Sequence, residues 1–396
     1  MSSSSFDLAL NDPDFHLGDV DAVYRRLRAE APVCWCGRAG MWAIARYADI
    51  QHVSRNPQQF CSGRGVIIND PMRDGTMPPG ALSIIYLDPP AHNRYRRLVS
   101  KAFTPRMVAA LEERVREITR QSLDAVPPEA VVDFVEHVAV PLPMLVIAEL
   151  LGVAGEDRAD FRRWSDAMIA GADLGSAATM ETVSQLFQYF FRTLEERRRT
   201  PRADLVSALA TAELDGERLA DDEILMFCVT LLVAGNETTR NLISGGARAL
   251  AEFPDQRRKL LADPSRIANG VEEMLRWVTP VKAFARTAVA DTTLGGQSIA
   301  AGDYLVLLYG SANRDEAVWG PTADCFDVMR SPEPGHLAFG FGQHLCLGAN
   351  LARLEARILF EELLARFPTF AVAGPVERLR STVINGIVRM PVRLQP

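Results

Sequence analysis

The sequence has few cysteines, and their spacing excludes several kinds of metal site. The 396 residues include six of them: Cys34, Cys36, Cys61, Cys228, Cys325 and Cys346. No CxxC pair occurs, whereas a structural zinc site or an iron–sulfur cluster needs about four ligands, normally in paired spacings. The absence of CxxCH excludes covalent haem attachment. Few, irregularly spaced thiols suit a reducing compartment, so we expect a cytoplasmic protein.

Long apolar runs and flexible tracts are also missing. The longest mostly apolar run, residues 226–234, is far shorter than the ~20 residues of a membrane-spanning helix. The serine-rich residues 1–6 lack the pattern of a signal peptide. Because there is no long Gly/Ser linker, charge block or internal repeat, residues 1–396 are predicted to form a single large domain, with a flexible segment over residues 1–10.

Positive charge is not in excess. The 43 Lys and Arg residues are outnumbered by 50 Asp and Glu residues, which gives a net charge of −7 and argues against general nucleic-acid binding. Hydrophobic residues make up 48% of the chain and charged residues 23%, which is ample for a large buried core.

Helical patterns dominate the middle of the chain, and short strand patterns flank it. Helices are predicted over residues 21–30, 92–103, 107–125, 142–151, 159–169, 180–200, 221–253 and 264–277, and after Cys346 as far as residue 366. Strands are predicted at 33–35, at 42–44 and between 284 and 308. Residues 62–85, rich in Gly, Pro and Met, are predicted to form a long irregular loop. The fold class is therefore mainly α with small β-sheets.

One cysteine stands in a glycine-rich loop directly before a helix. Residues 339–348 read FGFGQHLCLG, and a helix-forming run follows. The unpaired N–H groups and dipole of a helix N-terminus favour a thiolate. Gly342 and Gly348 allow the backbone to approach a large flat group closely, or to adopt positive φ. The pattern predicts that Cys346 holds one iron whose other ligands come from a cofactor. A buried structural cysteine beside a turn is the alternative.

The long helix predicted over 221–253 changes character at residues 234–239, AGNETT. Gly235 costs about 1 kcal/mol relative to Ala in a helix interior. Thr238 can donate a hydrogen bond to the carbonyl of Ala234 and loosen the helix. A polar, helix-weakening patch inside an apolar helix predicts a functional kink or groove. An exposed polar turn on a surface helix is the alternative.

These motifs resemble those of the cytochromes P450, the haem-thiolate monooxygenases. Residues 339–348 fit FGxGxHxCxG, residues 234–239 fit AGx[D/E]TT, and Glu273 with Arg276 fits ExxR; the match runs from about Asp88 to the C-terminus. The resemblance implies a P450-type domain with a long central helix, haem b, and Cys346 as the axial metal ligand. It implies that Thr238 hydrogen-bonds bound dioxygen and that Glu237 relays protons.

The resemblance also implies a structural network and a set of haem contacts. Glu273 and Arg276, which alone read as a solvated surface ion pair, would join Arg330 to support the loop of Cys346. The haem propionates would pair with four cationic or imidazole side chains. The residues expected to contact the cofactor are Cys346, His92, Arg96, Arg286, His336, Gly340, Phe339 and Ala234, while His344 is expected only to cap the loop.

By the same resemblance, the substrate pocket draws on four segments of the chain. The expected pocket residues are Ile67, Ile68, Met72, Leu231, Val233, Val281, Ala283, Phe284, Ile387 and Val388. Nearly all are apolar, which predicts an apolar substrate; the alternative is that many of them fill core. The segments 234–241, 311–316 and 379–387 resemble the bacterial branch that oxidises sterols, steroids, and branched lipids or terpenoids.

The expected activity is hydroxylation of a lipophilic small molecule with O2 and two electrons. The chain has no room for a fused reductase, so the electrons would come from a ferredoxin or flavodoxin and its NAD(P)H-dependent reductase. Four basic residues could attract an acidic donor: Arg94, Arg97, Lys101 and Arg106. A haem-thiolate isomerase, dehydratase or peroxygenase is the second hypothesis, and a non-catalytic haem sensor is the third.

Overall fold

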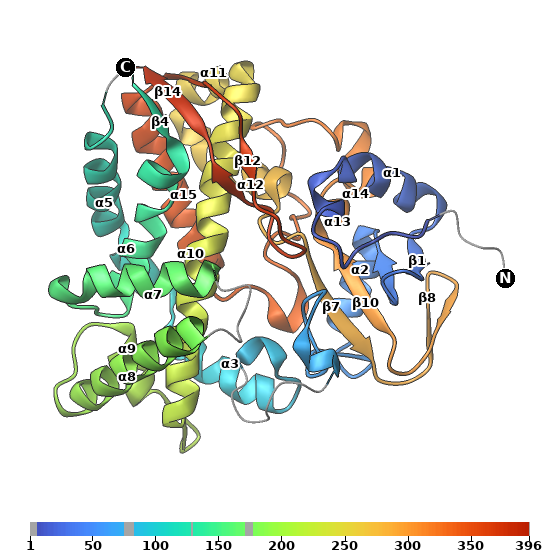
Figure 1. The fold of residues 1–396 in the computed structure, drawn as a ribbon, viewed down its shortest axis with the longest axis horizontal. Coiled ribbons are helices and arrows are strands. Elements are labelled where there is room, and N and C mark those ends of the chain that lie inside the picture. Colours follow the sequence, from blue (N-terminus) through green and yellow to red (C-terminus); the bar gives the residue numbers. More distant parts are fainter. Residues whose placement is uncertain (1–5, 75–82, 128–129, 171–176, 396) are drawn as a thin grey trace.

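The computed structural model describes residues 6–74, 83–127, 130–170 and 177–395. Its helical part is built around α10 (Asp221–Glu252), an uninterrupted helix of 32 residues. Figure 1 shows α10 crossing this part from end to end. The helices that pack directly on α10 are α6 (Pro141–Leu150), α7 (Arg158–Ala170), α8 (Ala177–Arg199), α9 (Leu205–Thr211), α11 (Pro254–Ala262), α12 (Ile267–Val278) and α15 (Ala349–Arg366).

The sequence of α10 explains both its start and its burial. Asp221, Asp222 and Glu223 stand in the first turn, where negative charge complements the helix dipole. Glu223 also accepts a hydrogen bond from the N–H of Ala220 at 2.8 Å. Ile224, Cys228 and Leu232 then recur with helical spacing and are buried. The helix expected over residues 221–253 is thus confirmed.

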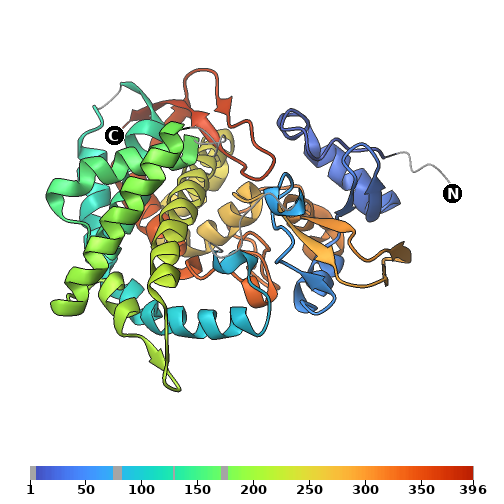
Figure 2. The same ribbon diagram turned by 60° about the horizontal axis from the view of Figure 1, so that its bottom comes forward.

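A five-stranded sheet forms the second part of the molecule. Its strand order is β1 (Val33–Cys36), β2 (Met41–Ile44), β10 (Tyr304–Leu308), β7 (Ala283–Ala288) and β3 (Phe60–Cys61). The β2–β10 pair is parallel and the other three pairs are antiparallel. Figure 2 shows this part beside the helical part, with the N-terminal end of the chain on its outer side. Strands some 250 residues apart in sequence therefore share one sheet.

Four smaller sheets complete the β structure of the described residues. The three-stranded one contains β4 (Val131–Asp133), β14 (Pro391–Gln395) and β11 (Thr369–Val372). Two-stranded pairs join β12 (Glu377–Arg378) to β13 (Ile387–Arg389), β5 (Glu213–Leu214) to β6 (Glu217–Arg218), and β8 (Thr292–Leu294) to β9 (Gln297–Ile299). The predicted class, mainly α with small sheets, is confirmed.

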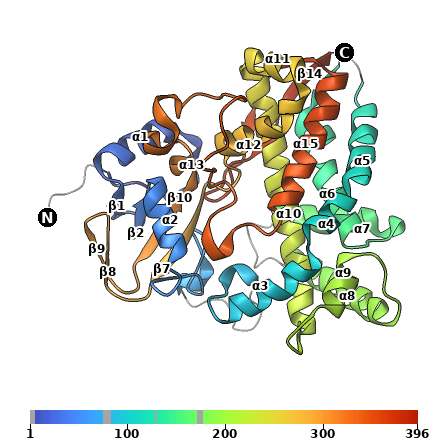
Figure 3. The same cartoon turned by 180° about the vertical axis from the view of Figure 1, so that it is seen from behind.

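The remaining helices are α1 (Val20–Glu30), α2 (Tyr47–Arg55), α3 (Ala91–Ala102), α4 (Pro105–Ala110), α5 (Glu112–Asp124), α13 (Tyr309–Ala312) and α14 (Glu316–Trp319). The single helix predicted over 107–125 is two helices, α4 and α5, which meet at Leu111. Figure 3 shows α5 beside α15. Pro264–Arg266 is a 3-10 turn ahead of α12 and not part of that helix.

The N-terminal segment is packed from Phe6 onward. Phe6, Leu8 and Leu10 are buried in a core that also contains residues of β1, β2 and β10. The flexibility predicted for residues 1–10 therefore does not hold over residues 6–10, because these apolar side chains find a core; residues 1–5 lie outside the described part. Of the predicted loop 62–85, residues 75–82 also lie outside it. In the described part, no helix is long and apolar enough to cross a membrane.

Candidate functional site

A cavity of ≈ 240 Å³ lies between α10 and the loop 339–348. We call it the central cavity. Leu231, Ala234 and Thr238 of α10 form one wall, and Cys346 stands on the loop side. α3, α6, α12 and α15 also contribute lining residues. The two motifs that the sequence singled out, residues 234–239 and 339–348, thus meet at one space although 99 residues separate them in the chain.

The loop presents Cys346 at the start of α15. Gly340 and Gly342 have φ of 71° and 72°, left-handed values that favour glycine. The N–H of Cys346 donates to the Phe339 carbonyl at 2.9 Å, which closes the loop. The Cys346 side chain is exposed toward the central cavity, yet protein surrounds it so fully that burial raises the pKa of its thiol. The N–H of Gly348 and the charges of Arg96 and Arg353 lower that pKa.

Basic and imidazole side chains gather at one edge of the central cavity. Arg96, Arg286, His92 and His344 all line it, and the two imidazole ring centres lie 4.3 Å apart. Burial, followed by the charges of Arg286, His92 and Arg96, lowers the pKa of His344 to about 2. Burial also lowers the pKa of His92. The cluster thus concentrates positive potential at this edge.

This cluster lacks the anions that would normally balance it. Both ring nitrogens of His92 are buried without a hydrogen-bond partner. Arg96 donates to the Leu345 carbonyl at 2.7 Å and Arg286 to the Ala285 carbonyl at 2.6 Å. Within the described residues, no carboxylate forms an ion pair with either arginine. A flat cofactor carrying carboxylates at one edge would supply these partners, so the residues fit haem with its two propionates.

The prediction that His336 joins this cluster is wrong. Its Nδ1 accepts a hydrogen bond from the N–H of Ala338 at 3.2 Å, and its Nε2 lies 3.3 Å from Glu272. Burial raises the pKa of Glu272, but His336 and Arg353 bring it to about 2. His336 therefore pairs with the carboxylate of Glu272 and does not line the central cavity. His344 takes the cavity position, with its Nε2 3.1 Å from the Ser62 hydroxyl.

On α10, the two predicted catalytic residues face different surroundings. Thr238 lines the central cavity and donates to the Ala234 carbonyl at 2.6 Å, as its position predicts. Glu237 is buried on the neighbouring face, where it accepts from Arg240 at 2.5 Å and from Asn241 at 2.9 Å. Its Oε2 has no partner. The helix runs without interruption through these residues, and of the two features expected from the sequence the groove can be traced to one residue.

The groove exists because α10 and α6 approach each other closely at Gly235. A Cβ atom at this position would lie 2.8 Å from Ile147 Cδ1. Both residues line the central cavity. Gly235 therefore removes the side chain that would otherwise fill this part of the space.

Of the ten residues predicted for the substrate pocket, three line the central cavity: Leu231, Val281 and Phe284. Ile68 and Ala283 are fully buried in the core next to β10. Ile387 lines a different cavity, and Val388 is 49% exposed. Ile67, Met72 and Val233 are partly buried but do not line the central cavity. These seven side chains do not line the central cavity as the described residues form it, and Ile68 and Ala283 fill core, the alternative given by the sequence.

Sequence reasoning missed several walls of the central cavity. These come from segments with no motif: Ile84, Ile85, Phe103, Ile147, Phe227 and Leu242. It also missed Glu355 on α15, which lines the cavity. Glu355 is buried, its Oε2 has no partner, and burial raises its pKa to about 8. A glutamate in an otherwise apolar helix face was the available signal.

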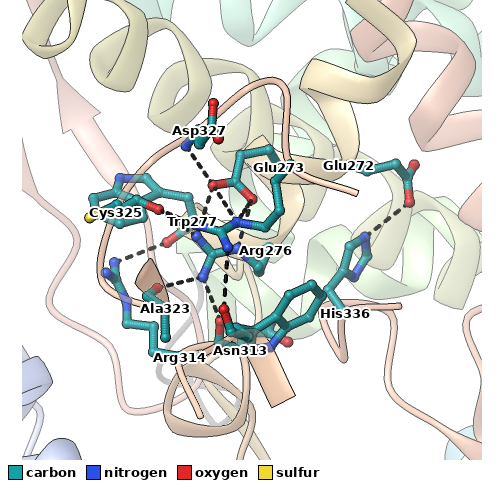
Figure 4. A network of polar contacts seen from close by, with 12 residues as sticks. Glu272, Glu273, Arg276, Trp277, Asn313, Arg314, Ala323, Cys325, Asp327 and His336 are labelled. Carbon is teal, nitrogen blue, oxygen red and sulfur yellow. Dashed lines mark hydrogen bonds and ion pairs between the residues drawn. The ribbon is translucent and has the colours of Figure 1, made fainter. Parts of the chain in front are cut away.

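Behind the loop, Glu273 and Arg276 form a buried network and not a surface pair. Their side chains are 2% and 1% exposed, and Arg276 donates twice to Glu273 at 2.7 and 2.8 Å. Arg330 lies 3.3 Å from the same carboxylate, which confirms it as the third partner. Figure 4 shows the network and the separate His336–Glu272 contact. The predicted motif is thus a structural unit.

Arg276 also ties three loop carbonyls together. It donates to Asn313 and Ala323 at 2.8 Å each and to Cys325 at 2.9 Å. Asn313 in turn accepts a hydrogen bond from the N–H of Leu337 at 2.7 Å, just ahead of the cysteine loop. The position of Cys346 therefore depends on a buried charge network on the side of the loop away from the cavity.

Comparison with known proteins identifies the family. The family model described as Cytochrome P450 matches residues 172–393. Steroid C26-monooxygenase of Mycolicibacterium smegmatis is 39% identical over 376 residues, covering 91% of this chain and 87% of the relative. Methyl-branched lipid omega-hydroxylase of Mycobacterium tuberculosis is 38% identical over 407 residues, covering 98% of this chain and 94% of the relative.

A solved structure agrees with the sequence matches. CYP109E1 from Bacillus megaterium in complex with testosterone superposes with a TM-score of 0.87 at 34% identity, covering 96% of this chain and 100% of that one. The superposition covers nearly the whole chain, so the match concerns the complete fold and not one segment of it. The chain therefore belongs to the cytochrome P450 family, as a bacterial-type monooxygenase similar to the CYP109 proteins.

Proposed function

We propose that the chain binds haem b in the central cavity, where the Cys346 thiolate would hold the iron. Bound there, the haem supplies the activation of O2 and the transfer of one oxygen atom to a C–H bond. Burial holds the thiol pKa of Cys346 high in the protein alone, so loss of its proton accompanies binding of the metal. The N–H of Gly348 and the charge of Arg96 then stabilise the sulfur anion.

We assign proton handling to Thr238 and Glu237. The Thr238 hydroxyl is fixed at the cavity wall by its bond to Ala234, and rotation away from that carbonyl frees its proton for transfer. Glu237 lies one residue earlier, on the side away from the cavity. Its unpartnered Oε2 can take up a proton, while Arg240 and Asn241 hold the other oxygen in place. Thr238 is the catalytic residue, and Glu237 supplies protons to it.

We propose that the substrate is an apolar small molecule, of the steroid or sterol, terpenoid or branched-lipid class. The observation that carries this proposal is a set of apolar side chains that line the central cavity and form an apolar wall. These are Phe103, Ile147, Phe227, Leu231 and Phe284. Such a wall favours apolar ligands with few polar anchors. The names of the two monooxygenase relatives and the testosterone complex support the same class.

We propose a cytoplasmic enzyme that acts as one domain and takes two electrons from a separate ferredoxin or flavodoxin with its NAD(P)H-dependent reductase. Of the four basic residues predicted to attract an electron donor, two already have partners within the chain. Arg94 pairs with Glu223 at 2.7 Å and with Glu217 at 3.1 Å. Lys101 donates to the Glu213 carbonyl at 2.8 Å. Arg97 and Arg106 are exposed and remain the residues with which an acidic donor would interact.

Spectral titration followed by product analysis tests the proposed function. The haem-loaded protein is titrated with a panel of steroids, terpenoids, branched fatty acids and aromatic acids, and the compounds that bind are incubated with O2, NAD(P)H and a ferredoxin couple. We expect hydroxylated products from an apolar compound, dependent on the reductase. Binding of polar aromatic acids alone would contradict the substrate class. Turnover that needs only peroxide would assign a peroxygenase instead.

A further inference from the structure

A second cavity, of ≈ 290 Å³, lies outside the haem-binding region. We call it the polar cavity. Its lining residues come from α1, the second half of α10, the end of α12 and the strands β12 and β13, together with the segments next to them. It shares no lining residue with the central cavity. The reaction at Cys346 therefore does not account for it.

Four cationic side chains line the polar cavity, and they divide into two pairs. Arg248 donates to Glu252 at 2.7 Å, and Arg314 lies 3.4 Å from Asp21, so these two are neutralised by carboxylates. Lys282 and Arg378 are bound only to backbone carbonyls. Lys282 donates to Ser381 at 2.9 Å. Arg378 donates to Leu17 and His16 at 3.0 and 3.1 Å.

Lys282 and Arg378 therefore form no ion pair with the three carboxylates of the same lining, Asp19, Asp21 and Glu252. Neither lies within ion-pair distance of an Asp or Glu in the described part of the chain. Burial, and then the charge of Arg378, lowers the pKa of Lys282 to about 8. The two cations are thus close enough to repel each other, and Lys282 is only 8% exposed. Lys282 is buried and Arg378 is half-buried, and repulsion between such cations is costly unless an anion joins them.

A third polar group in the same cavity also lacks a partner. Tyr24 of α1 lines the cavity and is 3% exposed, and its hydroxyl has no hydrogen-bond partner. Buried hydroxyls are normally hydrogen-bonded. Lys282 can donate three hydrogen bonds and Arg378 five, so most of their capacity is also unused. Two cations held only by backbone carbonyls and one unpartnered hydroxyl, from three distant segments of the chain, therefore belong to the lining of one cavity.

We propose that the polar cavity binds a small carboxylic acid, whose carboxylate is held by Lys282 and Arg378 and approached by the Tyr24 hydroxyl. The planar fork of Arg378 matches a carboxylate. The other half of the lining is apolar, with Ala249, Val278 and Ile387, and accommodates a short hydrocarbon body. The volume suits a ligand of only a few carbon atoms in length.

The site lies next to the wall of the central cavity. Val281 lines the central cavity and Lys282 lines the polar cavity, because successive residues of an extended segment point to opposite sides. The backbone of Lys282 is also held by the C-terminal segment, since its N–H donates to the Val383 carbonyl at 2.7 Å. The carboxylic acid would thus bind on one side of residues 281–282, with the central cavity on the other side.

Calorimetric titration of the haem-loaded protein with hexanoate tests this proposal. A saturating azole ligand first occupies the central cavity, so that binding there does not contribute. We expect one saturable site, with affinity about tenfold or more lower in Lys282→Met and in Arg378→Gln. Arg378→Lys, which keeps the charge, should restore part of the affinity. Lys101→Met, a matched change at an exposed lysine of α3, should have no effect.

Proton uptake gives a second readout that a structural role would not produce. A bound anion favours protonated Lys282, so binding near pH 8 should take up a proton, and the affinity should fall as the pH rises above 8. Lys282→Met should abolish both effects. Absence of saturable hexanoate binding, or equal affinity for hexylamine, would overturn the proposal. Equal affinity for inorganic phosphate would overturn the carboxylic-acid class. None of these outcomes depends on turnover.

Discussion

Two buried glutamates near the central cavity occupy opposite environments. Glu237 accepts hydrogen bonds from Arg240 and Asn241, so its charge is compensated. Glu355 has no such cation, and burial alone raises its pKa to about 8. Residue type is therefore a poor guide here, because burial without a cationic partner decides the pKa of Glu355.

Glu355 should make stability depend on pH. Its pKa is raised from 4.5 to about 8 in the folded protein, so the folded state binds the extra proton between these values. As the pH rises from about 4.5 to 8, the folded state loses stability relative to Glu355→Gln, at a rate on the order of 1.4 kcal/mol per pH unit. Above pH 8 the difference should stay constant. Thermal denaturation of both proteins from pH 5 to 9 measures it.

The control for Glu355→Gln is Glu156→Gln, a change at an exposed glutamate. Its thermal midpoint should differ from that of the unmodified protein by the same small amount at every pH. A difference between Glu355→Gln and the unmodified protein that does not vary with pH would show that Glu355 is ionised throughout.

Thr238→Ala should separate electron consumption from product formation. The variant keeps the cavity and the helix, so haem and substrate should bind as before. Loss of the hydroxyl removes the proton donor, so product formed per NAD(P)H should fall by about tenfold or more, with hydrogen peroxide released instead. Thr230→Ala is the matched control, because Thr230 lines the same cavity and bonds back to Met226 in the same way. Coupled turnover in Thr238→Ala would contradict the role.

At the scale of elements, the shape of the central cavity depends on how closely α10 and α6 pack. Gly235 permits that approach, and Ile147 of α6 fills the space beside it. A helix interior normally disfavours glycine by about 1 kcal/mol. Glycine therefore lowers helix stability at the point where α10 lines the central cavity.

Gly235→Ala should leave stability nearly unchanged but weaken binding of bulky apolar ligands. The gain in helix propensity is about 1 kcal/mol, and it is offset by crowding of the new Cβ against Ile147 Cδ1, at 2.8 Å before relaxation. Adding Ile147→Val removes that methyl group and should restore affinity in the double variant. Spectral titration of the four proteins measures the coupling. Additive losses in the double variant would contradict direct contact.

At the scale of the whole molecule, the cavity that would hold haem is supported by a buried network of charged residues that do not line it. Arg276 is 1% exposed in its side chain and donates to Glu273 and to three backbone carbonyls. Through Asn313, this network reaches Leu337 at the start of the cysteine loop. Helices and loop from distant parts of the chain are thereby fixed relative to one another.

Arg276→Lys should reduce haem retention more than substrate affinity. Lysine cannot reproduce the fork to Glu273 together with the carbonyl bonds, and a buried charge that loses its partners costs about 3–5 kcal/mol. We expect a lower haem-to-protein ratio and a lower thermal midpoint. Arg26→Lys, in an exposed pair with Glu30, should leave both unchanged. Full haem retention in Arg276→Lys would exclude the supporting role.

Local motifs could be read from the sequence, whereas the walls of the site could not. Cys346, Thr238 and the pair Glu273–Arg276 were predictable because each acts within one loop or one helical turn. The choice between His336 and His344 was not, because spacing does not say which ring turns toward Glu272. Phe103 and Ile147 reach the cavity only through packing of distant helices, which no single segment encodes.

The central claim is that Cys346 provides the thiolate for haem, and the CO complex of the reduced protein tests it most directly. We expect the red-shifted Soret band of thiolate-ligated haem in the unmodified protein and in Cys325→Ala, a matched change at an exposed cysteine. Cys346→His, which offers a nitrogen ligand instead, should retain haem but lose the red shift. Survival of the red-shifted band in Cys346→His or Cys346→Ala would contradict the account.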